Sequence, residues 1–302
     1  MLRPIGLRIA VAAFCTMVFA GRGEHPSEAS AVYASTARSD PSPTAPDTPE
    51  ITGLRQQLAT DPHDADAHYA LGLALRRIGR PHEALVHFEA AIQFGSQKQE
   101  RVIDLGVAYA DVSRFRDAEA QYRRVLEVAP HNPTALENLG SLAFLRGDMA
   151  SAIDLYRQSL AAEPKNLVAH YRLAHACKFV GRSEEAYGEY NRVLAIQPAS
   201  QREQQHQIDS YYNMATIDMA RGDYQKAETS LRQVIGRQPE HQHAHYMLAQ
   251  VLIRLGRERE AQQEIDTHMQ ILASHPFPGV SDSQGTAVAG DEENGAARQA
   301  LP

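Results

Sequence analysis

A two-residue signature returns along this chain at a nearly fixed interval. Six Leu-Gly, Leu-Ala or Met-Ala pairs share one phase of the sequence, and an interval of about 34 residues separates successive members of this set in all cases but one. The pairs are Leu71-Gly72, Leu105-Gly106, Leu139-Gly140, Leu173-Ala174, Met214-Ala215 and Leu248-Ala249. A unit of this length accommodates two short antiparallel helices, and such a pair buries its apolar face only by stacking on the next pair. The period therefore predicts an all-α solenoid of about six stacked units.

Two further positions of each unit hold side chains of defined size. The first position is alanine in every unit, at Ala84, Ala118, Ala152, Ala186, Ala227 and Ala261. Because a methyl group lets two helices approach closely, this position predicts the crossing point of the two helices in a pair. One helical turn later the chain places Phe88, Tyr122, Tyr156, Tyr190, Leu231 and Ile265. We predict that these large residues form the core between neighbouring pairs.

Glycine and proline mark the ends of the helices. Gly79, Gly147, Gly181, Gly222 and Gly256 separate the two helices of five units, and Ser113 takes this position in the second unit. Pro130, Pro164, Pro198 and Pro239 close four units. Glycine ends a helix in the left-handed conformation without strain, and proline cannot continue a helix. Periodicity and helix boundaries therefore agree.

Small residue, large aromatic, turn glycine and closing proline at these offsets resemble the tetratricopeptide repeat (TPR) family. The resemblance covers about residues 65–274, although the chain has no Trp for the family's large first-helix position. That position holds His68, Val102, Leu136, His170, Tyr211 and His245. The resemblance implies a right-handed solenoid with units at 65–98, 99–132, 133–166, 167–200, 208–241 and 242–275.

The register slips once, between the fourth and fifth units. Ala186 and Ala227 are 41 residues apart, so seven residues, 201–207, are inserted. Seven residues make about two helical turns, and this stretch is rich in Gln and Glu, which form helices readily. We expect an elongated first helix in the fifth unit. A longer surface loop is the alternative.

The N-terminal segment, residues 1–20, differs in composition from the rest. Arg3 and Arg8 precede a short apolar run, Ile9 to Ala20, which ends in the small-residue pattern of a signal peptidase site. We expect an exported protein, periplasmic or secreted, with cleavage after Ala20. The alternative is that this segment is not cleaved, in which case it would attach the chain to the membrane. Cleavage leaves 28 basic and 37 acidic residues, which makes nucleic acid an unsuitable partner. Cys177 then remains as a single thiol, expected as a buried hydrophobic residue.

Segments of low complexity flank the units. Residues 21–50 are rich in Pro, Ser and Ala and are expected to be disordered. After them Ile51, Leu54 and Leu58 recur at helical spacing, which predicts a capping helix over 51–62. No comparable cap follows the sixth unit, where the apolar stripe Ile265, Met269 and Leu272 precedes a tail, 276–302, also expected to be disordered. Exposure of this stripe would permit self-association through the C-terminal end, and the alternative is that the last helix turns it inward.

The resemblance implies that the first helix of each unit lines a concave surface that holds ligands. Four tyrosines share one position there: Tyr69, Tyr171, Tyr212 and Tyr246. Phenols suit peptide recognition because they combine contact area with a hydrogen bond. The alternative is that they are partly buried packing residues. We therefore expect a protein or peptide partner.

Three polar residues share the neighbouring position: Asn138, Arg172 and Asn213. In some relatives an Asn there pairs with the backbone of an extended peptide, and Arg172 interrupts this ladder. Arg76, Lys178 and Arg254 add positive charge that would favour an acidic peptide or a chain terminus. The family's two-carboxylate clamp needs Lys and Asn where this chain has Tyr171 and His175, so recognition of a chaperone tail is not supported. We still expect both residues to be part of the partner-binding surface.

Histidine is the residue type that most invites a chemical interpretation. The chain has 14 histidines, including His241, His243 and His245 in one run. On a helix His241 and His245 share a face while His243 points away, and His245 repeats the packing position of His68 and His170. No Cys or carboxylate completes a ligand set with a recognisable spacing. We expect no metal site and no cofactor, with weak metal binding as the alternative.

No catalytic motif is recognisable either. The chain lacks a glycine-rich phosphate loop and a nucleophile elbow. We therefore expect a non-catalytic scaffold or adaptor of the cell envelope. The alternative is an accessory subunit of an envelope enzyme complex that makes polysaccharide or matures cytochromes.

Overall fold

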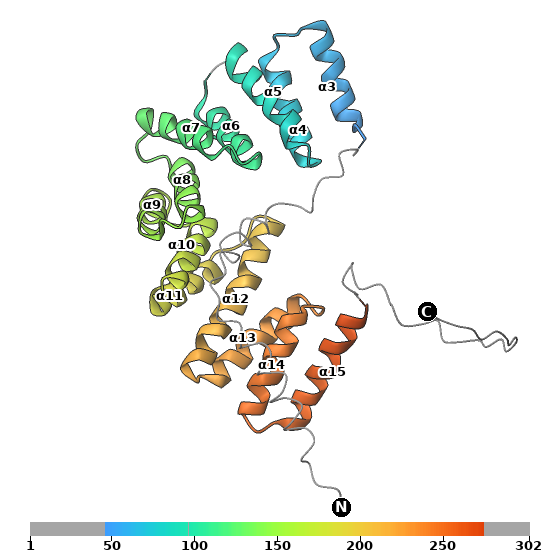
Figure 1. The fold of residues 1–302 in the computed structure, drawn as a ribbon, viewed down its shortest axis with the longest axis vertical. Helices are drawn as coiled ribbons and strands as arrows, with labels where there is room; N and C mark the ends of the chain where they lie inside the picture. Colours follow the sequence, from blue (N-terminus) through green and yellow to red (C-terminus); the bar gives the residue numbers. More distant parts are fainter. Residues whose placement is uncertain (1–45, 96, 275–302) are drawn as a thin grey trace, which may run out of the picture. The chain divides into compact units, whose positions relative to one another are not determined.

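The computed structural model describes residues 46–95 and 97–274, and these ranges contain 13 α-helices and no β-strand (Figure 1). The chain divides into two compact units, residues 1–210 and 211–302, with the division inside helix α12 (Gln201–Arg221). The expected signal peptide 1–20 and tail 276–302 lie outside the described residues, as does the expected linker up to residue 45. The all-helical prediction is confirmed.

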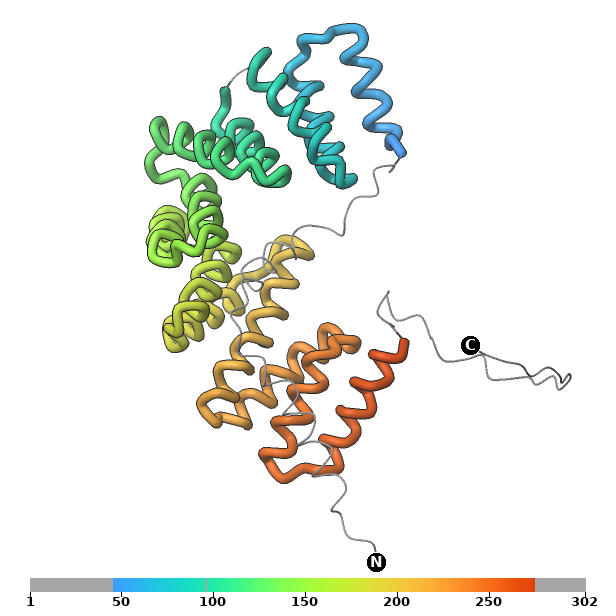
Figure 2. The backbone as a smooth tube through the Cα atoms, viewed as in Figure 1, coloured from blue at the N-terminus to red at the C-terminus, as the bar shows by residue number. Residues whose placement is uncertain are grey.

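The first unit contains four antiparallel helix pairs that follow one another in chain order (Figure 2). The first helices are α4 (Ala65–Arg77), α6 (Gln99–Asp111), α8 (Pro133–Leu145) and α10 (Leu167–Phe179). The second helices are α5 (Pro81–Phe94), α7 (Phe115–Val128), α9 (Met149–Ala162) and α11 (Ser183–Ala195). Each second helix packs on its own first helix, and α5, α7 and α9 also pack on the first helix that follows.

A single helix, α3 (Pro49–Thr60), precedes these pairs and packs on α4. It begins two residues before the expected start at 51, so the linker expected to reach residue 50 ends earlier. The reason is local: the Thr48 hydroxyl accepts a hydrogen bond from the Ile51 N–H at 3.3 Å, and Pro49 has the backbone angle of a first helical residue. The helix also ends two residues before the expected end at 62.

The Leu-Gly signature is explained by close approach of the two helices in a pair. A methyl group at Gly106 would lie 2.5 Å from the ring of Tyr122, and one at Gly140 would lie 2.7 Å from the ring of Tyr156. Both tyrosines are almost completely buried. Glycine therefore leaves room for the aromatic residue that fills the core.

The turns within the pairs have the left-handed backbone that the glycines predict. Gly79, Gly147, Gly181, Gly222 and Gly256 have φ between 75° and 82°. Ser113 adopts φ of 62° at the equivalent position, which strains a residue with a side chain.

The seven inserted residues, 201–207, form a helix and not a loop. Helix α12 has 21 residues, compared with 13 in each of the other first helices. Its early turns contact the end of α11. Nε2 of Gln207 donates hydrogen bonds to the carbonyl oxygens of Val193 at 3.2 Å and Ile196 at 2.8 Å. These contacts satisfy helix-end carbonyl groups.

The second unit contains the rest of α12, followed by α13 (Tyr224–Arg237), α14 (Gln242–Arg254) and α15 (Glu258–Ser274). Its core includes the fully buried side chains of Leu231, Val234, Leu248 and Leu252. Within the described ranges, no helix combines the length and the apolar character needed to cross a bilayer.

Candidate functional site

The side chains predicted to bind a partner lie on the first helices, and they fall into two groups. Tyr69, Arg76, Asn138, Tyr171, Arg172, His175 and Lys178 belong to the first unit, on α4, α8 and α10. Tyr212, Asn213, Tyr246 and Arg254 belong to the second unit, on α12 and α14. We call the first group, with its neighbours on the same helices, the first-helix face of the first unit.

Two of these side chains join α4 to α6. The Tyr69 hydroxyl donates a hydrogen bond to the Asp104 carboxylate, and Arg101 lies over the Tyr69 ring, 5.1 Å from its centroid. Burial and the bond to Asp104 raise the pKa of Tyr69 above its usual value of 10. Nε of Arg76 lies 2.5 Å from Oδ2 of Asp111. Both contacts connect neighbouring pairs, so these polar groups already have partners within the chain.

Tyr171 is covered by the inserted turns of α12. Its ring stacks on His206 with 4.2 Å between centroids, and its hydroxyl donates to Asp209 at 3.4 Å. Only 7% of Tyr171 and 9% of His206 are exposed. Burial, aided by the nearby charge of Arg202, lowers the pKa of His206 to about 3, so this imidazole is neutral. The insertion therefore shields the centre of α10.

Arg172 takes part in a buried polar cluster. Its guanidinium donates to Oγ of Ser141 and lies 3.2 Å from a carboxylate oxygen of Glu137. The Tyr156 hydroxyl donates to the same Ser141 oxygen at 3.3 Å. Glu137 is only 8% exposed, so Arg172 compensates a carboxylate that would be costly to bury alone. Arg172, which interrupts the expected Asn ladder, is therefore engaged within the chain.

Asn138 and His175 are neutral polar groups on the same face. Asn138, on α8, is half-buried, and its carboxamide makes no hydrogen bond with any residue that the structure describes. His175 is half-buried, with its ring 5.3 Å from that of Tyr171. Burial and the charge of Lys178 lower the pKa of His175 to about 4. Neither group adds charge to the face at neutral pH.

In the second unit the predicted residues are less alike. The Tyr212 ring lies 5.3 Å from that of His241, and the Tyr246 ring lies 5.4 Å from that of His268. Asn213 is buried, with 7% exposure, whereas Arg254 is exposed at the end of α14. The two tyrosines are half-buried, as expected for the alternative of partly buried packing residues.

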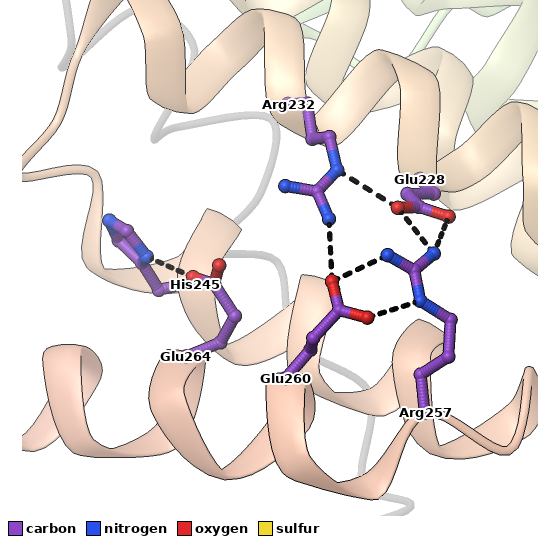
Figure 3. Close-up of polar contacts among 6 residues, drawn as sticks. All are labelled: Glu228, Arg232, His245, Arg257, Glu260 and Glu264. Carbon is purple, nitrogen blue, oxygen red and sulfur yellow. Dashed lines mark hydrogen bonds and ion pairs between the residues drawn. The ribbon is translucent and has the colours of Figure 1, made fainter.

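Three histidines use both ring nitrogens to hold a helix pair together. Nδ1 of His170 lies 2.7 Å from Glu189 and Nδ1 of His245 lies 2.6 Å from Glu264, the latter shown in Figure 3. His68 meets His87 in the same way at 3.0 Å. Nε2 of each lies near a proline carbonyl six residues earlier, Pro62, Pro164 or Pro239. The constant spacing between each histidine and its partner on the second helix is a signal that the sequence interpretation missed.

His241 of the histidine run also has a structural role. Nδ1 of His241 accepts a hydrogen bond from the Ala244 N–H at 3.1 Å and caps the start of α14. Among the residues that the structure describes, no group of three or more His, Cys, Asp or Glu side chains is placed to hold a metal ion.

Ion pairs connect successive second helices. In Figure 3, Arg232 and Glu228 of α13 form a closed ring of ion pairs with Arg257 and Glu260 at the start of α15. Asp47, Arg55, Arg80 and Glu83 form a similar ring around α3 and α5. Exposed pairs of this kind contribute little stability individually. They nevertheless pair much of the charge on these helices within the chain.

Comparison with known proteins identifies the family. One tetratricopeptide repeat model matches residues 52–98 and 103–166, and a second matches residues 143–206 and 218–275. The chain belongs to the tetratricopeptide repeat family. TPR proteins act as protein-interaction scaffolds, and the TPR fold is typically non-catalytic.

The relatives of this TPR chain have diverse names. It is 26% identical over 185 residues to the peroxisomal targeting signal receptor of Kluyveromyces lactis, covering 60% of this chain and 31% of the receptor. It is 26% identical over 182 residues to cellulose synthase operon protein C of Pseudomonas fluorescens, covering 60% and 12%. The chain thus spans less than a third of either relative.

Solved structures support the same fold. The crystal structure of the APC/C hetero-tetramer Cut9–Hcn1 matches with a TM-score of 0.60 at 14% identity, covering 75% of this chain and 43% of that one.

Proposed function

We propose that this TPR chain is a non-catalytic adaptor that holds an extended peptide segment of a partner protein on the first-helix face of the first unit. The observation that carries the proposal is Asn138, whose carboxamide makes no hydrogen bond with the described residues. A carboxamide offers one acceptor and two N–H donors, which matches the donor and acceptor of a peptide group. Asp104 and Arg172 hold the same register in the two neighbouring repeats, and both are engaged within the chain.

Apolar side chains on the same set of helices supply contact area for such a segment. Leu73 on α4 is 39% exposed and Phe179 at the end of α10 is 55% exposed. Phe179 also contacts Phe144 of α8 edge to face, with 6.0 Å between ring centroids. A peptide that combines backbone hydrogen bonds to Asn138 with apolar side chains near these residues fits the chemistry of the face.

Export to a bacterial-type cell envelope is part of the proposal. Arg3, Arg8 and the apolar run that ends at Ala20 support it. A second candidate function is an accessory subunit of an envelope enzyme complex that makes polysaccharide. The similarity to cellulose synthase operon protein C favours this candidate.

Binding on the first-helix face is tested with a photo-reactive amino acid placed at Asn138 or, as a matched control, at Asn191. Asn191 is an exposed residue of the second helix α11. We expect crosslinks from position 138 to one partner segment, identified by mass spectrometry, and their loss in excess unlabelled chain. Crosslinks of equal yield from both positions would contradict binding on the first-helix face.

Export has a separate test. Mass spectrometry of the chain purified from fractionated cells should give an N-terminus at Gly21 in the envelope or secreted fraction. A chain that retains Met1 and stays in the cytoplasm would contradict export without affecting the proposed binding face.

A further inference from the structure

The seven inserted residues at the start of α12, 201–207, lie over the centre of α10, and we call them the cover. His206 of the cover stacks on the ring of Tyr171, and both residues are almost completely buried. The repeats do not require this contact, because the equivalent alanines of the other neighbouring repeats are 34 residues apart and no residues are inserted there. The cover is therefore an addition to the repeat fold, placed over a side chain that is a candidate for partner binding.

Closure of the cover buries polar groups that the chain does not pair. Neither ring nitrogen of His206 has a hydrogen-bond partner among the residues that the structure describes. The hydroxyl of Tyr190 in α11 is likewise buried without a partner in the described ranges, and 6.4 Å separates the ring centroids of Tyr190 and Tyr171. A neutral imidazole has one donor and one acceptor to satisfy, so leaving both unpaired weakens the closed arrangement. Release of the cover returns the His206 ring to water.

The cover has its own helix cap, so its helical form does not depend on α10. Oγ of Ser200 accepts a hydrogen bond from the Glu203 N–H at 3.2 Å, and a carboxylate oxygen of Glu203 accepts one from the Ala199 N–H at 2.7 Å. This exchange is close to a capping box. The Tyr171 hydroxyl donates to Asp209 at 3.4 Å, which is long for a hydrogen bond to a carboxylate. The cover is thus a preformed helix, and a long hydrogen bond and a ring stack attach it to Tyr171.

The groups around His206 oppose its protonation while the cover is closed. Arg202 of α12 and Arg172 and His175 of α10 each disfavour a positive charge on this imidazole. Tyr190 of α11 brings no charge, because burial raises the pKa of its hydroxyl above the usual 10. The closed cover therefore requires a neutral His206.

The carboxylate of Asp209, also on α12, does not offset these groups. Its oxygens accept hydrogen bonds from the Tyr171 hydroxyl and from Nε2 of Gln205 at 2.9 Å. Burial, followed by the charges of Arg202 and Arg172, holds the pKa of His206 at about 3, compared with 6.5 for an exposed histidine. A histidine whose pKa is lowered by closure favours the closed state above pH 6.5 and opposes it increasingly below that pH. A fall from pH 7.5 to pH 5 should shift the equilibrium toward the open state by about thirtyfold.

We infer that residues 201–207 form a pH-sensitive cover, which lies over Tyr171 at neutral pH and releases it when His206 becomes protonated in mild acid. Release exposes Tyr171, Arg172 and His175 beside Asn138, and so enlarges the first-helix face of the first unit. This consequence for partner binding rests on the proposed function. Release of the cover does not, because it requires no partner.

The first test is hydroxyl-radical footprinting of the full chain at pH 7.5 and pH 5, read by mass spectrometry and normalised to a reporter peptide in the same solution. Tyr156 is the internal control, because it is buried in the third repeat and lies outside the cover. We expect oxidation of Tyr171 to rise by about threefold or more at pH 5, with no change at Tyr156. No rise at Tyr171, or an equal rise at both tyrosines, would overturn the inference.

The second test repeats the measurement with variants that cannot titrate at this position. His206→Phe keeps an aromatic ring on Tyr171, and His206→Gln keeps a polar side chain. His131→Phe, which replaces an exposed histidine before α8, is the matched control. We expect both position-206 variants to lose the acid response and His131→Phe to retain it, with Tyr156 protected throughout. A response that persists in both position-206 variants would overturn the inference. Since no partner is present, failure of crosslinking at Asn138 would contradict the proposed function alone.

Discussion

Nδ1 of His170 lies 2.7 Å from a carboxylate oxygen of Glu189, and each residue is only 6% exposed. Nε2 of the same ring lies 3.0 Å from the Pro164 carbonyl oxygen, so the imidazole joins α10 both to α11 and to the preceding turn. The third repeat has Leu136 and Leu155 at the positions of His170 and Glu189. One architecture therefore accepts either a polar or an apolar pair here.

This equivalence predicts the outcome of a double-mutant cycle. His170→Leu alone removes a hydrogen-bond partner from buried Glu189 and should lower the free energy of unfolding by about 2 kcal/mol. His170→Leu with Glu189→Leu reproduces the apolar pair of the third repeat and should lie within about 1 kcal/mol of the parent chain, or above it. Urea unfolding of the parent chain, the two single variants His170→Leu and Glu189→Leu, and the double variant measures both effects. A double variant less stable than His170→Leu would contradict the equivalence.

The same pair predicts a difference in acid sensitivity. Burial disfavours the Glu189 carboxylate, but hydrogen bonds from His170 and Arg192 outweigh burial and hold the pKa of Glu189 below its usual 4.5. A carboxyl group with a lower pKa in the folded state stabilises the fold above its unfolded pKa, and this contribution disappears as the pH falls through the folded pKa. The parent chain should therefore lose more stability than the double Leu variant between about pH 5 and pH 3. Equal losses in thermal melts at the two pH values would contradict this assignment.

The sequence predicts the repeated core because each core position depends on residues of the same helix pair. Ala118 and Tyr122, for example, are one turn apart, and their roles follow from helical geometry. The polar contacts of the site depend instead on neighbouring repeats. Asp104 lies 35 residues after Tyr69, and its type is not repeated at a fixed register, so periodicity does not reveal the pair. The shielding of Tyr171 by His206 depends on the direction of the inserted turns, which the register slip leaves undetermined.

The strained turn of the second repeat predicts a stabilising substitution. Ser113 has φ of 62°, where the other five repeats have glycine. An L-residue in this conformation costs about 1–2 kcal/mol, and glycine avoids most of that cost while losing more entropy on folding. Ser113→Gly should raise the free energy of unfolding by about 0.5–1 kcal/mol. Gly147→Ser, the reverse change in the third repeat, should lower it by a similar amount, and calorimetry that finds the same sign for both would contradict this explanation.

Gly106 of the Leu-Gly signature and Gly188, an exposed glycine outside it, predict opposite effects for the same substitution. At Gly106 a new Cβ would lie 2.5 Å from the buried Tyr122 ring, so Gly106→Ala should destabilise the chain by about 1–3 kcal/mol through overpacking. At Gly188, exposed in α11, no neighbouring atom lies within 4 Å of the new Cβ, so Gly188→Ala should stabilise it by about 0.5–1 kcal/mol. The fifth repeat pairs Ala215 with Leu231 at the positions of Gly106 and Tyr122. Adding Tyr122→Leu to Gly106→Ala should therefore recover part of the lost stability in urea unfolding, and a further loss would mean that the glycine serves a purpose other than space for the ring.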